Sequence, residues 1–368
     1  MSDSNKDKFF KNYNQGIPQI IKKEFIADIE TPISSLIKIS ENEEYSFLLE
    51  SVEGGDQRGR YSILGCDPDI IWEVNKNKAK VTSLNQDLDL SFLSEDPIKS
   101  LKQLVDFSKI NKESNSSPFP VLVGYLGYPM IQLMEKINLN NPDEINIPDA
   151  LMIRPKLVAV FDNIKDTINI QTSIYPDKKI TAELAFSNAN DYINIIIKKL
   201  NRDIPKESLF KKNKKLTLDF KSNYTKKEYF NIVDKAKDYI IKGDIFQVVP
   251  SQRLKTDYNL SAQTLYRSLR RLNPSPFLVN LNFNNFGLVA SSPEILVRLR
   301  ENNITIRPIA GTRKRGKTIN EDIKLSKDLL NDEKEIAEHL MLLDLGRNDV
   351  GRVAKIGSVK VTEKMIIE

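Results

Sequence analysis

Apolar residues recur at helical spacing in the stretch DEKEIAEHLMLLDLGRNDVG, residues 332–351. An apolar helix face is indicated by the steps of three and four positions that separate Ile336, Leu340 and Leu343. Asp332 precedes this run as a candidate N-cap, and Gly346 follows it as a candidate end. The pattern therefore predicts a helix that begins at Asp332 and ends near Gly346.

Strand and helix patterns alternate over a predicted N-terminal domain, residues 17–200, which follows a loose polar leader, residues 1–16. Alternating or continuous apolar residues predict strands at 45–52, 61–65, 70–74, 79–83, 118–130, 150–162 and 166–174. The helical period predicts helices at 97–110 and 178–200. The Gly-Cys-Asp-Pro stretch around Cys66 is expected to form a turn between two of these strands.

A lysine-rich stretch, residues 201–222, is predicted to be a solvated linker to a second domain, residues 223–368. Thr225 and Glu228 form a capping-box sequence before a helix that Gly243 ends. Another helix is predicted at 260–272, and strands are predicted at 244–254, 276–283, 287–290, 295–300, 304–309 and 355–367.

Composition narrows the classes of function. The 368 residues are 40% hydrophobic and 29% charged, which is ordinary for a globular protein. The net charge of +5 comes without a basic strip interleaved with aromatic residues, so no nucleic-acid partner is expected. The single cysteine, Cys66, excludes an internal disulfide. Because no apolar run approaches the roughly 18 residues of a membrane span, and the start is unlike a signal peptide, we expect a cytoplasmic protein without a membrane partner.

Two carboxylates on the predicted 332–346 helix are candidate metal ligands. Glu335 and Glu338 lie three positions apart, so both project from one face. Mg²⁺ is typically held by one or two carboxylates, with water and substrate oxygens completing its shell. An isolated pair of this kind is more often a solvated acidic face, here balanced by Lys334. His339, the single histidine, lies about 100° round the helix from Glu338 and is expected to be structural.

Several ordered segments resemble anthranilate synthase component I, the chorismate-using subunit that opens tryptophan biosynthesis: LLESVEGG, GDIFQVVPS, NPSPF, SSPE, PIAGTR and EKEIAEHLMLLDLGRNDVGR. The resemblance runs from Thr31 to the last residue. It implies an α+β fold of two layers, with mostly antiparallel sheets and flanking helices. It also implies conversion of chorismate and ammonia to anthranilate and pyruvate with Mg²⁺. A separate glutamine amidotransferase subunit would supply the ammonia.

The resemblance assigns chemical roles to single residues. Glu294 of SSPE matches the family's acid for the leaving hydroxyl, a role that needs a raised pKa and therefore burial beside other carboxylates. Gly311 and Thr312 match substrate contacts, and Arg313 is expected to add positive charge beside them. A glycine lets the backbone approach an anion, and a threonine offers N–H and hydroxyl donors.

The same resemblance assigns Glu338 as the Mg²⁺ ligand and Glu335 as a neighbouring carboxylate that acts through water. Gln247 stands where the water-using isochorismate and salicylate synthases carry a lysine base, and ammonia needs no such base. Ala310 stands where aminodeoxychorismate synthases commonly carry a nucleophilic lysine, and alanine cannot attack. Both positions favour anthranilate, with aminodeoxychorismate synthase component I as the alternative.

A feedback pocket for L-tryptophan is also implied, between the two domains of the family. Ser51 matches its key contact, and Pro276, Phe277 and Leu278 match a second segment that is often Pro-Tyr-Met. Phe277 and Leu278 lose a hydroxyl and a thioether but keep the pocket apolar, so tryptophan binding is expected. A non-catalytic tryptophan-binding module is the alternative of another class.

The chain stops at TEKMIIE without a turn, a cap or a polar tail. We therefore expect a sequence that is cut short at its C-terminal end. The resemblance places a second metal-binding glutamate and a catalytic histidine beyond residue 368, so the chain as given is expected not to turn over.

Overall fold

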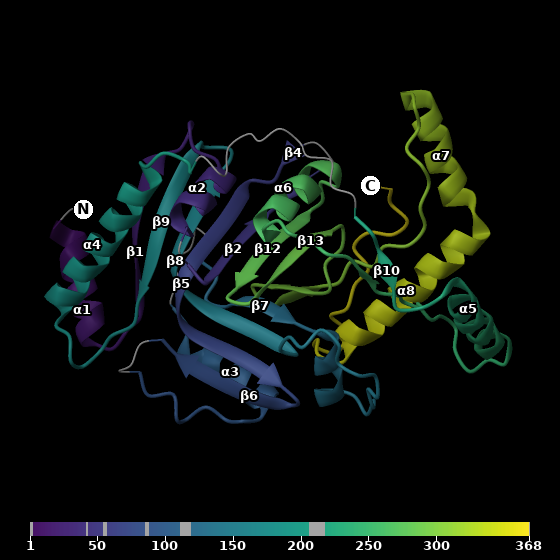
Figure 1. Ribbon diagram of the computed structural model, residues 1–368, viewed down its shortest axis with the longest axis horizontal. Helices are drawn as coiled ribbons and strands as arrows, with labels where there is room; N and C mark the ends of the chain where they lie inside the picture. Colours follow the sequence, from purple (N-terminus) through teal and green to yellow (C-terminus); the bar gives the residue numbers. More distant parts are fainter. Residues whose placement is uncertain are drawn as a thin grey trace.

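A nine-stranded antiparallel sheet forms the centre of the computed structural model, which describes residues 3–41, 43–53, 57–84, 88–110, 119–205 and 218–367 (Figure 1). Its strands run in the order β1 (Gln19–Ile26), β9 (Thr167–Ile174), β8 (Ala150–Asp162), β5 (Tyr61–Asn75), β2 (Tyr45–Glu50), β12 (Phe277–Phe283) and β13 (Phe286–Ser292). Two further strands pair beside this path, β6 (Lys78–Ser83) with β5 and β7 (Val123–Leu126) with β8. The expected α+β fold with antiparallel sheets and flanking helices is confirmed.

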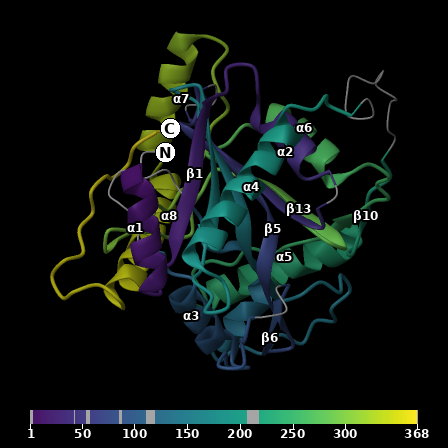
Figure 2. The same ribbon diagram turned by 90° about the vertical axis from the view of Figure 1, so that its left-hand side faces the viewer.

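Three helices from the first half of the chain, α1 (Asp3–Asn14), α2 (Pro32–Ile39) and α4 (Ala182–Leu200), lie on the same side of the molecule (Figure 2). Buried apolar residues from these helices and the sheet form one core. The prediction of a loose leader is wrong, because Phe9 and Tyr13 of α1 are buried and the Phe9 ring lies 5.2 Å from that of Phe186. Phe9 and Tyr13 are four positions apart, so they share one helix face.

Helix α3 (Pro97–Phe107) covers a second core, around Trp72. The Trp72 side chain is fully buried, and its Nε1 donates to Ser100 Oγ over 3.1 Å. The strand predicted over 118–130 is shorter: β7 is followed by the 3₁₀ helix η1 (Tyr128–Leu133), because Pro129 cannot donate to a strand ladder. A Cβ on Gly124 would lie 1.9 Å from the carbonyl oxygen of Leu151, so a glycine is needed where these two backbones approach.

The turn expected around Cys66 is wrong, because the predicted strands 61–65 and 70–74 belong to the single strand β5. The chain stays in the sheet through a register shift between Pro68 and Ile70, which accommodates the proline. Asp69 at this shift accepts from Arg154 Nε over 2.7 Å and from Arg154 Nη2 over 2.6 Å. Buried Arg154 thus pins the irregular part of the strand.

The sheet continues across the predicted domain boundary. Strand β12 pairs with β2, and Leu278 lies opposite Glu50 in that ladder. Helix α6 (Ala262–Leu272) packs on β12 and β13. The lysine-rich part of the linker lies outside the described residues. The division into domains at 201–222 stays a prediction.

Local signals in the second half give a mixed outcome. The capping box at α5 (Lys226–Ile241) is confirmed, because Glu228 Oε2 accepts from the Thr225 N–H over 2.8 Å. The strand predicted over 244–254 is wrong, since the chain there is irregular until β11 (Leu254–Lys255), which pairs with β10 (Lys221–Ser222). Pro250 removes a donor that such a strand would need. Short pairs also join β3 (Val52–Glu53) to β4 (Gln57–Arg58) and β14 (Arg298–Arg300) to β15 (Asn303–Thr305).

Helices α7 (Ile319–Asn331) and α8 (Glu333–Gly351) lie at the end of the molecule opposite α1 and α4 (Figure 1). The Asp332 N-cap of α8 is confirmed, but the predicted end at Gly346 is wrong, because the helix continues to Gly351. A Cβ on Gly346 would lie 3.4 Å from Ile306 Cγ2, an ordinary van der Waals separation, so Ile306 lies beside this part of the helix. Residues 355–367 form no strand. Within the described residues, no helix has the length and apolar character needed to cross a membrane.

Candidate active site

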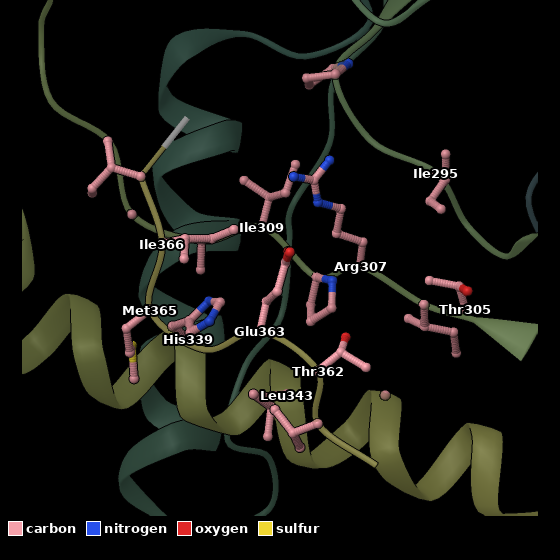
Figure 3. A pocket seen from close by; sticks show the side chains of 18 of the residues that line it. Ile295, Thr305, Arg307, Ile309, His339, Leu343, Thr362, Glu363, Met365 and Ile366 are labelled. Carbon is pink, nitrogen blue, oxygen red and sulfur yellow. The ribbon is translucent and has the colours of Figure 1, made fainter. Parts of the chain in front are cut away.

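A cavity of about 1440 Å³ opens where α7 and α8 meet the segment 302–315 and the segment 353–367. Figure 3 shows His339 and Leu343 of α8 on one side, with Arg307, Ile309 and Glu363 projecting into the same space. The volume exceeds the roughly 300–1,000 Å³ that is typical of small-molecule sites. A small ligand would therefore fill part of it.

The cavity wall combines apolar surface with an excess of positive charge. Its basic side chains are Arg298, Arg307, Arg313, Lys314, Arg315, Arg347, Lys355 and Lys360. Its acidic side chains are Asp322, Glu335 and Glu363. An excess of one sign in a concave, partly apolar site raises the local concentration of ligands of the other sign. The cavity therefore favours a small anion.

The loop with Gly311 and Thr312 lines the cavity beside the first turn of α8. Gly311 has φ +78°, a conformation that glycine adopts without strain. A Cβ at this position would lie 3.2 Å from Glu335 Oε2 and 3.1 Å from Leu329 Cδ1. The glycine is therefore needed twice, for its backbone conformation and for its close approach to the Glu335 carboxylate.

The expected role of Arg313 is corrected by its contacts. Its Nε donates to Asp328 Oδ2 and its Nη2 to Asp332 Oδ2, each over 2.7 Å. These carboxylates raise the pKa of the guanidinium, through hydrogen bonds to Asp328 and then Asp332. The pKa of Asp332 is lowered, first by the N–H of Glu335 and then by Arg313. The charge of Arg313 is therefore matched within the protein and not offered to a ligand.

The two candidate metal ligands of α8, Glu335 and Glu338, are placed differently. Glu335 lines the cavity, whereas half-buried Glu338 is not among the lining residues in the described part of the chain. His339 lines the cavity with Glu335 and Leu343, because these residues follow one another at steps of four on one helix face. The four-residue spacing of His339 from Glu335, rather than its neighbour Glu338, is the sequence signal that places it in the cavity.

The described residues contain no cluster of three or more histidine, cysteine, aspartate or glutamate side chains that could hold a metal ion. Glu335 and Glu338 still provide the one or two carboxylates that a Mg²⁺ site usually takes from protein, with water and substrate supplying the remaining oxygens. The two side chains fit this minimal donor set. The assignment of either residue to a metal stays a prediction.

Glu294 lacks the burial that its proposed role needs, and Gln247 lies outside the cavity wall. Glu294 Oε1 accepts from the N–H of Ile309 over 3.1 Å, which ties the turn after β13 to the cavity wall. Its side chain is nevertheless exposed, so the burial expected for an acid is not found in the structure described here. Gln247 is exposed on the irregular segment before β11 and does not line the cavity.

The two segments expected to form the tryptophan pocket lie side by side. Leu278 pairs with Glu50 in the sheet, and the N–H of Val52 donates to Ser275 O over 3.0 Å, so Ser51 lies within this pairing. Pro276 and Phe277 also line the cavity described above. The proposed inhibitor segment and the proposed substrate loop therefore border one continuous space.

The buried Glu50 carboxylate, on the strand that pairs with Leu278, was not predicted from the sequence. Glu50 is 7% exposed, and its carboxylate accepts from Tyr266 Oη over 2.6 Å and from Arg270 Nη2 over 2.8 Å. Burial, reinforced by the Glu50 charge, raises the pKa of Tyr266. Tyr266 and Arg270 lie four positions apart on α6, so one helix face delivers both. That spacing was the available signal, but nothing in the sequence pointed to Glu50 as the partner.

Comparisons with known proteins agree on one relationship. The sequence profile of chorismate binding enzymes matches residues 46–368. Anthranilate synthase component 1 from Cereibacter sphaeroides is 45% identical over 365 residues, which are 98% of this chain and 73% of that relative. The same component from Aquifex aeolicus is 40% identical over 370 residues, 98% of this chain and 72% of the relative.

Solved structures give the same result. Anthranilate synthase component I from Streptococcus pneumoniae aligns with a TM-score of 0.68 and 32% identity, over 84% of this chain and 66% of that one. The menaquinone-specific isochorismate synthase from Escherichia coli aligns at 0.53 with 13% identity, over 95% of this chain and 68% of that one, a likeness of fold. By profile and by relatives of this identity and coverage, the chain belongs to the chorismate binding enzymes and, within them, to the family of anthranilate synthase component 1.

Proposed function

We propose that this chain is the chorismate-binding subunit of anthranilate synthase, which converts chorismate and ammonia to anthranilate and pyruvate in the cytoplasm. The observation that carries the proposal is the position of the loop with Gly311 and Thr312 against Glu335, inside a cavity with excess positive charge. Chorismate is a small dianion, so such a wall suits it. The 45% identity to an anthranilate synthase component 1 supports the same conclusion.

Each residue has a stated task in this proposal. Gly311 and Thr312 offer backbone and hydroxyl donors to the substrate carboxylates, and Glu294 protonates the hydroxyl that leaves as water. Glu338 would hold Mg²⁺, with Glu335 acting through water, and the ion would neutralise substrate charge as that hydroxyl departs. Glu294 already reaches the cavity wall through the N–H of Ile309. Its exposed side chain must become covered for efficient acid catalysis, because burial is what keeps a carboxyl protonated near neutral pH.

Partners and regulation belong to the same proposal. A glutamine amidotransferase subunit supplies ammonia, and Gln247 stands where a water-using relative would need a base. L-Tryptophan binds beside Ser51 and the segment formed by Pro276, Phe277 and Leu278. The pairing of Leu278 with Glu50 supports a single pocket built from both segments. The amidotransferase contact is expected from the relatives named above.

The test measures anthranilate fluorescence from the full gene product with chorismate, an ammonium salt and Mg²⁺. Glu294→Gln is expected to lower kcat by about 10²–10⁴-fold, the range for loss of a general acid. Glu338→Gln is expected to cost at least about 10²-fold, because a metal ligand is lost. Glu333→Gln changes an exposed carboxylate on the same helix and should leave the rate unchanged.

The product itself separates the alternatives. Aminodeoxychorismate in place of anthranilate would replace the proposal with the related synthase, although Ala310 on the cavity wall supplies no nucleophile for that route. Tryptophan binding by calorimetry, without any Mg²⁺-dependent turnover of chorismate, would replace it with a non-catalytic binding module. A wild-type rate in both the Glu294 and Glu338 variants would refute the assigned roles.

A further inference from the structure

Arg313 contacts three structural elements at once. Its guanidinium reaches Asp328 on α7, Asp332 at the start of α8 and, with 3.8 Å between Nη1 and Oε1, Glu335 in the first turn of α8. Nη1 also donates to Thr312 O, in its own loop, over 3.1 Å. The side chain is 24% exposed, so these contacts lie partly away from solvent. One planar group therefore joins the loop to both helices.

These contacts act on the backbone that faces the substrate. Because Nη1 holds Thr312 O, the peptide that follows Thr312 is attached to the same guanidinium as the start of α8. Gly311 lies against the Glu335 side chain so closely that an added Cβ would be 3.2 Å from Glu335 Oε2 and the carboxylate would have to shift. A shift of the loop would break the hydrogen bond to Thr312 O and open the contact between Gly311 and Glu335.

The carboxylates around Arg313 also indicate that it holds the loop and the two helices together. Asp332 is the N-cap of α8, and its Oδ1 accepts from the N–H of Lys334 over 3.0 Å and from the N–H of Glu335 over 3.2 Å. Without Arg313, the carboxylates of Asp328, Asp332 and Glu335 would face one another without the cation that now lies among them, and like charges at this range repel. The planar fork of arginine presents donors in fixed directions to two of these carboxylates at once, whereas a lysine ammonium is a point charge on a flexible stem.

We propose that Arg313 is a positioning residue: it fixes the distance between the substrate loop, Gly311 and Thr312, and the Glu335 carboxylate of α8. This inference rests on the proposed function, because the distance matters to catalysis only if the loop binds the substrate. It differs from the expectation that Arg313 attracts the substrate, because its donors are directed to Asp328, Asp332 and Thr312. The arginine acts on catalysis through the loop and the helix, without contacting the substrate.

The kinetic test uses the full gene product with ammonium as nitrogen donor. Arg313→Ala is expected to lower kcat/KM for chorismate by about 10²-fold, the effect of a misplacement of about 1 Å in an active site. Arg313→Lys restores charge without the fork and should recover only part of this loss. Arg300→Ala, which removes an exposed arginine outside the cavity wall, serves as the matched control and should stay at the wild-type rate.

Asp328→Asn separates positioning from substrate attraction. If Arg313 positions the loop, the loss of its Asp328 partner lowers kcat/KM, and the Arg313→Ala/Asp328→Asn double variant loses less than the two single losses combined. If Arg313 instead attracts chorismate, Asp328→Asn frees its charge and lowers the KM for chorismate. The second result would overturn the proposal.

Hydrogen exchange gives a readout that needs no turnover. Arg313→Ala should speed exchange of the amides of residues 310–316 and 332–336, while Arg300→Ala should leave both segments unchanged. Unchanged exchange in Arg313→Ala would overturn the positioning role, whatever the kinetics. A wild-type protein that makes no anthranilate but shows the expected exchange would refute the proposed function and keep the positioning role.

Discussion

Tyr266→Phe isolates one hydrogen bond between α6 and β2. The tyrosine is fully buried, and its hydroxyl donates over 2.6 Å to the Glu50 carboxylate, which is 7% exposed. Phenylalanine keeps the ring and removes only the hydroxyl. A hydrogen bond to a charged group contributes about 1.5–3 kcal/mol to stability. Because Arg270 still donates to the other carboxylate oxygen, over 2.8 Å, we expect a loss of about 2 kcal/mol in the free energy of unfolding.

Urea unfolding measures this loss. Trp72 is the single tryptophan of the chain and is fully buried, so its fluorescence reports loss of the sheet core. Tyr239→Phe changes a tyrosine that is 40% exposed and is expected to stay within about 0.5 kcal/mol of wild type. The slope against urea should be equal in all three proteins, since the surface exposed on unfolding is unchanged.

A double-mutant cycle with Glu50→Gln assigns the energy to the pair. If the hydroxyl and the carboxylate interact as described, the two substitutions together cost less than the sum of the single effects. A Tyr266→Phe protein as stable as the Tyr239→Phe control would show that the buried contact contributes nothing, and the reasoning would be wrong.

Two further predictions concern pH and the inhibitor. Burial raises the pKa of Tyr175 to about 12, whereas the unfolded value is about 10; the unfolded state therefore loses its proton first, and stability falls as pH rises between these values. Tyr175→Phe should weaken this alkaline fall, measured as the slope of unfolding free energy against pH from 9 to 11, and an unchanged slope would refute the assignment. Ser51→Ala should weaken tryptophan binding about fivefold in calorimetry, as expected for one lost hydrogen bond of about 1 kcal/mol, while anthranilate formation without tryptophan continues; unchanged affinity would remove Ser51 from the pocket.

Local sequence determined the features that depend on neighbouring residues. The Thr225 and Glu228 capping box and the Asp332 N-cap were predictable, because a short polar side chain bonds backbone N–H groups two or three positions ahead of it. The helical and alternating periods also located most helices and the long hairpin of β8 and β9, since each pattern states which side of an element is apolar. The motifs that resemble the family could be recognised in the sequence for the same reason, because each is a contiguous run of residues.

Only the tertiary structure decided which distant residues meet. Glu50 could not be matched to Tyr266 and Arg270 from sequence, because more than 200 positions separate them. Gly346 resembled a helix end in the sequence, but α8 continues past it to Gly351, with Ile306 beside it. From the sequence, Arg313 was expected to offer positive charge to a ligand, but the structure shows that it donates to Asp328 and Asp332. The sequence determines what each side chain can do, but the energy of a buried charge depends on the groups that folding brings within a few ångströms of it.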